Sequence, residues 1–222
     1  MDHAGSRTPP RWLLALVIFG LLASQGCTAF TSNLLYWIHG GHKLPAEYSG
    51  LAEQRVAIVS VANASTVGPH SMSRLVERAV GLILNQNVKK IQIVPQEEIA
   101  DWIDQNDWDQ LDYREIGRGV AADKVLAIDL DSVRLHEGMT LYKGRADLIV
   151  SVYDMNDEGR VVFRKSIPDF TFPRNSARHS TEMSEARFRE MFVMVLSQHI
   201  AKHFYEYRIE EDFAHDAVGL AY

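Results

Sequence analysis

From Arg55 onward, short apolar runs alternate with longer amphipathic stretches, a pattern that predicts a sheet with helices packed on it. Residues 56–61 form an apolar run rich in β-branched side chains, which is typical of a buried strand. Apolar residues then recur at helical spacing: Met72, Leu75, Val76, Ala79, Val80, Ile83 and Leu84. This stripe predicts an amphipathic helix that buries one face against the sheet, with Glu77 on the opposite, solvent-facing side.

The rest of the pattern predicts the order of the elements. After the first strand and helix, the expected elements are a strand at 91–94, helices at 96–105 and 112–122, a three-strand meander at 125–135, 141–154 and 160–166, an irregular loop at 169–178, and a helix from an N-cap at Thr181 to about Tyr207. Asp112 is the expected N-cap of the helix that follows it. We therefore expect an α+β fold, with a single mixed β-sheet, helices packed on it and a long C-terminal helix.

The first 27 residues have a different pattern. Arg7 and Arg11 are followed by an uninterrupted apolar run at 12–23, and then by small or polar residues up to Cys27, the only cysteine of the chain. A basic start, an apolar middle and a short polar end are typical of a secretory signal. A signal that ends at a lone cysteine resembles a bacterial lipoprotein signal with its lipobox. That resemblance implies cleavage before Cys27, lipidation of its thiol with palmitate-like chains, and membrane anchoring in the cell envelope.

Two other interpretations of this segment stay open. The apolar run of 12 residues is too short for a bilayer of about 30 Å, which needs roughly 20 residues. An uncleaved amino-terminal anchor extending to Phe30 would place Ser24 and Gln25 in hydrocarbon. Ordinary secretion is the second alternative, although secreted proteins generally use cysteines in pairs. We expect a signal peptide at 1–26, a lipidated stalk at 27–54, the α+β domain at 55–207 and a flexible tail at 208–222.

Composition excludes one class of partner. Of the 222 residues, 46% are hydrophobic and 23% are charged, which is ordinary for a globular protein, and the formal net charge is −6. A nucleic-acid-binding surface needs a basic stripe that displaces counterions from the phosphate backbone, and the sequence contains none. We therefore expect no nucleic-acid partner.

Residues 55–207 also resemble a group of small envelope domains. The features that carry this resemblance are the run 56–59, the amphipathic helix 72–84, and the stretch Gly-Val-Ala-Ala-Asp-Lys-Val-Leu-Ala-Ile at 119–128, which leads into the meander. The order of elements is similar to the TolB amino-terminal region, to penicillin-binding-protein activator lipoproteins and to the curli-secretion lipoprotein. Those families have no catalytic motif to carry over. The lipid anchor, the stalk, the α+β domain and the absence of a catalytic constellation lead us to expect a non-enzymatic, periplasm-facing protein that binds a protein partner in envelope assembly, secretion or wall synthesis. We expect the outer membrane rather than the inner.

Two pairs of histidines are the first candidates for metal chemistry. His199 and His203 are four residues apart on the closing helix, a spacing that can place two imidazoles on one metal. No glutamate follows His199, so the zincin pattern is missing. His39 and His42 flank two glycines in the stalk, where flexibility is the simpler interpretation. We expect no metal and no cofactor.

The remaining candidates for catalysis are carboxylates. Asp129 and Asp131 are two residues apart, near Asp123, and paired carboxylates are what acid–base chemistry needs. Charged positions that alternate along a strand are usually its wet face, so we expect no catalytic residues and no enzyme. An envelope hydrolase or metal-dependent enzyme built on these aspartates and the histidines is the alternative.

An aromatic set surrounds the mid-chain helices: Trp102, Trp108, Tyr113 and Tyr142. Core packing accounts for most of such a set. Residues 106–110, Asn-Asp-Trp-Asp-Gln, are different, because burial alone hardly explains a tryptophan between two acids in a turn. Aromatic side chains dominate binding hot spots. Trp108, Asp107 and Asp109 are therefore the expected contact residues for a partner.

Overall fold

The computed structural model describes residues 43–62, 72–106, 112–174 and 177–208 of the chain. The chain divides into two compact units, Met1–Lys43 and Leu44–Tyr222, and nearly all described residues belong to the second. The expected signal peptide, Cys27 and the tail beyond residue 208 lie outside the described residues. None of the helices in the described ranges combines the length and hydropathy that crossing a membrane requires.

The observed elements confirm the expected α+β class and the predicted order. They are β1 (Lys43–Leu44), β2 (Arg55–Ala62), α3 (Met72–Asn87), β3 (Gln92–Ile93), α4 (Gln96–Gln105), α5 (Tyr113–Gly119), β4 (Lys124–Glu137), β5 (Leu141–Asp154), η1 (Met155–Asp157), β6 (Arg160–Phe172), β7 (Arg178–His179), α6 (Glu185–Ala201), η2 (Lys202–Phe204) and β8 (Tyr207–Arg208). Here η marks a single turn of 3-10 helix.

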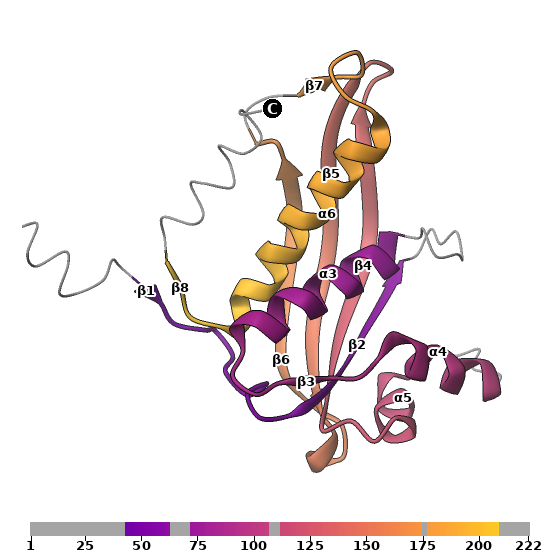
Figure 1. Cartoon of the computed structure of the whole chain (residues 1–222), viewed down its shortest axis with the longest axis vertical. Helices are drawn as coiled ribbons and strands as arrows, with labels where there is room; N and C mark the ends of the chain where they lie inside the picture. The colour runs from indigo at the N-terminus through magenta and orange to yellow at the C-terminus, as the bar shows by residue number, and fades with distance from the viewer. Residues whose placement is uncertain (1–42, 63–71, 107–111, 175–176, 209–222) are drawn as a thin grey trace, which may run out of the picture. The chain divides into compact units, whose positions relative to one another are not determined.

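The main sheet is mixed, with the strand order β3-β2-β4-β5-β6, and β7 pairs with β5. β2 is parallel to both of its neighbours, so that Val56 lies opposite Ile93 on one side and Lys124 on the other. β4, β5 and β6 form the antiparallel meander (Figure 1). Parallel strands need a crossover connection. α3 makes the first crossover, from β2 to β3, and the α4–α5 segment makes the second, from β3 to β4.

One face of the sheet, here called the front face, is covered by the two long helices. α3 and α6 pack on each other and both cross this face in Figure 1. The fully buried side chains between the helices and the sheet include Val76, Val80, Leu84, Phe188, Phe192, Leu196, Leu126, Ile128, Leu148 and Val150. The stripe predicted for the first helix is thus confirmed as its buried face.

Several boundaries differ from the prediction, and α6 ends at Ala201, where the single 3-10 turn η2 follows, rather than continuing to about Tyr207. α6 begins after Ser184 rather than Thr181, and the Ser184 hydroxyl accepts a hydrogen bond from the Arg187 backbone N at 3.3 Å. β6 continues to Phe172, through the start of the stretch expected to be an irregular loop. The strand persists because alternate residues Phe170 and Phe172 bury their rings against the front face.

The segment just before β2 belongs to the packed domain. Leu51 is fully buried in the front core. The Tyr48 backbone N donates a hydrogen bond to the His203 carbonyl O at 2.9 Å. Packing therefore begins ahead of Arg55, inside the range expected to be a stalk.

The opposite face, here called the back face, is covered by shorter helices. A second apolar cluster lies there, made by Ala57, Val59, Val125 and Ala127 of the sheet together with Ile99, Tyr113, Ile116 and Val120 of the α4–α5 segment. These strand residues alternate with the front-face residues, as the period of a strand requires. The cluster covers β2 and the first half of β4, and it fixes the two short helices that make the site described next.

Candidate functional site

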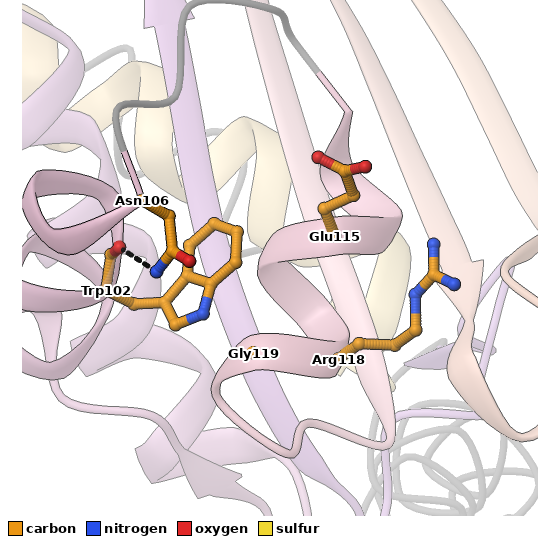
Figure 2. A pocket seen from close by; sticks show the side chains of 5 residues that line it. All are labelled: Trp102, Asn106, Glu115, Arg118 and Gly119. Atoms are coloured by element: carbon orange, nitrogen blue, oxygen red, sulfur yellow. Dashed lines mark hydrogen bonds between the residues drawn. The ribbon is translucent and has the colours of Figure 1, made fainter.

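α4 is held on the back face by one buried side chain. Ile99 is buried in the back cluster, whereas Trp102, one turn later, is only partly buried. The helix ends at Asn106, whose side-chain amide donates a hydrogen bond to the Trp102 carbonyl O at 2.8 Å (Figure 2). The indole is therefore attached to a well-defined last turn.

α5 is anchored more deeply. Asp112 is its N-cap, as predicted, and its carboxylate accepts a hydrogen bond from the Arg114 backbone N at 2.9 Å. Ile116 is fully buried, and the Tyr113 hydroxyl donates a short hydrogen bond to Asp129 on β4. Burial, together with the bond to this carboxylate, raises the pKa of Tyr113. The phenol thus stays protonated and continues to donate at neutral pH.

A cleft of about 500 Å³ opens between the two helices. Its lining residues are Trp102, Asn106, Glu115, Arg118 and Gly119. Figure 2 shows the Trp102 indole beside the last turn of α5, with Glu115 and Arg118 projecting from that helix. Glycine at 119 permits this approach, because a Cβ atom there would lie 2.0 Å from the indole Nε1. The shape of the cleft therefore depends on Trp102 of α4 and Gly119 of α5 together.

The exposed face of α4 is acidic. Glu97, Asp101 and Asp104 are exposed on this helix, which carries no basic residue in its last turn. Like charges spaced three or four residues apart on a helix repel one another. On the α5 side Arg118 is exposed, and its Nε donates to the Arg114 carbonyl O at 3.2 Å. The exposed face of α4 favours a partner that brings positive charge to it.

The chemistry of the cleft suits binding. Its lining residues offer an aromatic surface, an amide, a carboxylate and a guanidinium group. Within the described ranges, no group of three or more histidine, cysteine, aspartate and glutamate side chains is placed to hold a metal ion. The cleft can thus accommodate a planar or aliphatic side chain and pair with charges on either side of it.

The residues expected to contact a partner are not themselves described. Trp108, Asp107 and Asp109, like Cys27, lie outside the described residues. Residues 107–111 nevertheless connect α4 to α5 along the chain. Trp102 packs against the back cluster, as core packing predicts, and it also lines the cleft between these helices. The contact role of Trp108, Asp107 and Asp109 stays a prediction.

The aspartates considered for catalysis have separate positions. Asp123 accepts a hydrogen bond from the Arg55 backbone N at 2.8 Å, at the start of β2. Asp129 accepts the bond from Tyr113, and Asp131 is exposed at a bulge in β4. The first two are six residues apart along the chain, about 20 Å for an extended strand. The structure does not gather the three carboxylates at one place.

Glu77 is a functional candidate that the sequence missed. It was expected to face solvent, and this prediction is wrong. Its carboxylate accepts hydrogen bonds from the Ser60 backbone N at 2.5 Å and from the Gln96 side chain at 3.1 Å. Burial raises its pKa to about 7, against the lowering effects of the Ser60 bond and of Arg74. β3 pairs only with the first residues of β2. The Ser60 N–H therefore has no partner in β3, and the Glu77 carboxylate accepts its hydrogen bond instead.

Comparison with known proteins gives distant likenesses of fold. No family model matches the chain, and no curated protein matches its sequence. The PelC dodecamer from Paraburkholderia phytofirmans matches with a TM-score of 0.43 and 13% identity, over 74% of this chain and 97% of that one. Lipoprotein GNA1162 from Neisseria meningitidis matches with 0.43 and 13%, over 66% and 97%. The LpoB C-terminal domain from Salmonella enterica matches with 0.35 and 15%, over 53% and 84%. TM-scores and identities this low describe only a general likeness of fold.

Proposed function

We propose that this chain is a non-enzymatic, lipid-anchored protein of the bacterial cell envelope whose α+β domain binds a protein partner. Its amino-terminal pattern, which ends at Cys27, supports the anchor and a periplasm-facing location. The single observation that carries partner binding is the cleft between α4 and α5, which is lined by a partly exposed indole. Envelope assembly, secretion and wall synthesis are the processes in which such a partner would act.

The chemistry of the cleft indicates what kind of partner it takes. Glu97, Asp101 and Asp104 favour a segment that carries lysine or arginine, because charge complementarity speeds association and selects partners. Trp102 offers a planar surface on which an arginine side chain can stack. We infer that the partner presents one side chain that enters the cleft and basic residues that reach the exposed face of α4.

Site-specific photo-crosslinking of the full chain in living cells tests this function. A crosslinking residue at Glu115 should capture one defined protein, and the same residue at Lys89, which is 76% exposed near the end of α3, should not. Trp102→Ala should lower the yield from Glu115 by a factor of about ten or more, as truncation of a hot-spot residue does. Equal capture from both positions, or no effect of Trp102→Ala, would overturn the assignment of the cleft.

A charge reversal tests the acidic face of α4. Asp104→Lys should weaken crosslinking from Glu115, and raising the salt concentration should reduce the difference between this variant and the natural chain. Glu190→Lys is the matched control, because Glu190 is an exposed acid on α6, on the front of the sheet. A partner that binds both variants alike does not use this face of α4.

The anchor has a test of its own. Labelled palmitate should be incorporated into the natural chain and not into Cys27→Ala, and an inhibitor of lipoprotein signal peptidase should block processing of the natural chain. If neither the labelling nor the processing differs between the two chains, Cys27 is not lipidated. The amino-terminal segment would then be either an uncleaved membrane anchor or the signal of an ordinary secreted protein.

A further inference from the structure

A second hollow, of about 340 Å³, lies at the carboxyl end of α6. Its lining residues are Leu44, Pro45, Glu47, Arg174, His199, Lys202, His203 and Tyr207. They come from the start of the domain, from the chain just after β6, from the end of α6 and from β8. The hollow therefore depends on the tertiary fold, and it is separate from the cleft between α4 and α5.

Glu47 organises one wall of this hollow. Its carboxylate accepts hydrogen bonds from the Lys165 Nζ at 2.9 and 3.1 Å and lies 3.0 Å from the Nδ1 atom of His203. The bond from Lys165 is the main reason that the pKa of Glu47 is lowered. The negative charge of Glu47 is thus engaged by two groups of the protein itself.

The contact with Glu47 orients the His203 ring and leaves its other nitrogen without a partner. Nδ1 faces the carboxylate, and Nε2 is buried without a hydrogen-bond partner among the described residues. A buried polar atom of this kind is uncommon in folded proteins and needs an explanation. In the imidazolium form of His203, Nε2 carries a proton, and a bound group that accepts a hydrogen bond from it would supply the partner.

The surroundings of the two histidines are positively charged. His199 lies one turn before His203, with 5.9 Å between the ring centroids. Burial, and then the positive charges of His203, Lys202, Arg174 and Lys165, lower the pKa of His199 to about 4. Cations thus gather around one small hollow in a chain whose net charge is −6. Such a gathering favours an anionic ligand.

We propose that this hollow binds a phosphate group, held by His203 Nε2 together with the side chains of Arg174 and Lys202. Arginine pairs with phosphate oxygens in a bidentate manner, and lysine contributes a point charge. Phosphate suits the site better than a carboxylate does, because its three or four oxygens can serve several donors at once. None of these three residues lines the cleft between α4 and α5, and none takes part in the proposed anchor.

The source of the phosphate follows from where the hollow lies along the chain. Leu44 and Pro45 form part of its wall, and the 18 residues from Cys27 to Leu44 span at most about 60 Å when extended. A chain tethered at Cys27 keeps the hollow within that distance of phospholipid headgroups. The headgroup assignment rests on the proposed anchor, whereas the phosphate chemistry does not.

Phosphate binding is expected to be coupled to proton uptake. Burial lowers the pKa of His203 and Glu47 opposes this effect, while Lys165 adds to the lowering. His199, Lys202, Arg174 and Tyr207 also border the hollow. A bound anion favours the imidazolium form, so it raises the pKa of His203. Affinity for phosphate should therefore increase as the pH falls through the range in which His203 titrates.

A titration of the full chain in neutral detergent tests the chemistry. Inorganic phosphate should shift the His203 side-chain resonances saturably in NMR spectra, and more phosphate should be needed at pH 8 than at pH 6. Arg174→Gln should weaken the affinity by about tenfold or more, as loss of a charge-assisted hydrogen bond does. Lys89→Gln, which removes an exposed cation outside the hollow, should leave it unchanged. No saturable shift, or equal affinity in Arg174→Gln, overturns the proposal.

A second titration identifies the source. Dihexanoyl phosphatidylglycerol should produce the same His203 shifts at lower concentration than inorganic phosphate does, and Arg174→Gln should weaken both. If inorganic phosphate binds and the short-chain lipid does not, the phosphate belongs to a soluble compound and the headgroup assignment is overturned. These outcomes are independent of crosslinking at the cleft and of lipid labelling at Cys27, so failure here is distinguishable from failure of the proposed function.

Discussion

The two faces of the sheet are covered in different ways. The front face is covered by α3 and α6, helices of 16 and 17 residues, and its core includes fully buried aromatic rings. The back face is covered only in part, by α4 and α5, helices of 10 and 7 residues. Long amphipathic helices close their side of the sheet, whereas short ones leave an indole and charged side chains at its border. We infer that the front face supplies most of the stability and that the back face supplies the binding site.

The largest effect should come from a charge in the front core. Val80→Asp places a carboxylate at a fully buried position of α3, where an unpaired charge costs several kcal/mol or forces protonation. Domains of this size have about 5–15 kcal/mol of stability, so Val80→Asp should remove much of it.

Leu82→Asp is the matched control, because Leu82 is on the same helix and 59% exposed. It should change the free energy of unfolding by about 0.5 kcal/mol or less. Chemical unfolding of the full chain in detergent, followed by circular dichroism, measures both variants. Similar unfolding midpoints for the two variants would show that this side of α3 is not the core.

A truncation in the back cluster should have a smaller effect. Ile116 is fully buried in α5, and Ile116→Ala should cost about 2–4 kcal/mol because it leaves a cavity. Glu115→Ala, at the exposed position before it, should cost little. The same unfolding measurement compares them. If Ile116→Ala is as mild as its control, the back cluster can reorganise freely and is not a second core.

The next largest effect on stability should come from a change at Glu77. This residue is on α3, at the front of the sheet, and its carboxylate accepts a hydrogen bond from Gln96 of α4. Its folded pKa of about 7 lies above the ordinary value of 4.5, so the folded state binds the proton more tightly than the unfolded state does. Its contribution to stability is complete below pH 4.5 and is lost as the pH rises to about 7. Glu77→Gln should therefore be neutral at pH 5 and should stabilise the protein at pH 8, by up to about 2–3 kcal/mol.

Thermal melts at the two pH values measure this difference. Glu190→Gln is the control, because it removes an exposed acid from the front surface. The same shift in both variants would indicate a general effect of net charge. A Glu77→Gln variant that is less stable at pH 8 would show that the ionised carboxylate is needed to hold the Ser60 N–H.

The smallest effect on stability should come from Gly119→Ala. The new methyl group would clash with the indole, whose Nε1 is 2.0 Å from the Cβ position, but the open cleft gives Trp102 room to rotate. The free energy of unfolding should change by about 1 kcal/mol or less, since alanine also favours a helix. The indole N–H resonance of Trp102, assigned by its loss in Trp102→Phe, should move. An unmoved resonance would show that Gly119 does not position the indole.

The fold was largely predictable because its signals are local. The stripe of α3 and the alternation along β4 and β5 each depend on residues within one element. The Asp112 cap was predictable for the same reason. The length of β6 was not, because Phe170 and Phe172 stay in a strand only when the rings of the front core are there to receive them.

The candidate sites were less predictable because they join distant residues. Trp102 and Gly119 are ordinary residues of two helices until packing brings the indole over the glycine. Glu77 was assigned to solvent because helical spacing shows which face is apolar, and cannot show that a backbone N–H will need its carboxylate. Glu47 and His203 are 156 residues apart, and no spacing rule relates them.

The hydrogen bond from Tyr48 to His203 has a mechanical consequence. Tension on a tether attached ahead of Leu44 would be transmitted into the domain through the segment that contains Tyr48. That residue is held by its bond to His203 and by ring contacts with Phe163 and Phe204, at centroid distances of 5.8 and 6.4 Å. The first contacts to carry the force would be the pairing of β1 with β8 and then the contacts of Tyr48, which together form a latch between the two ends of the domain. A pull strong enough to open this latch would also separate Glu47 from His203, while the sheet and the cleft between α4 and α5 stayed intact.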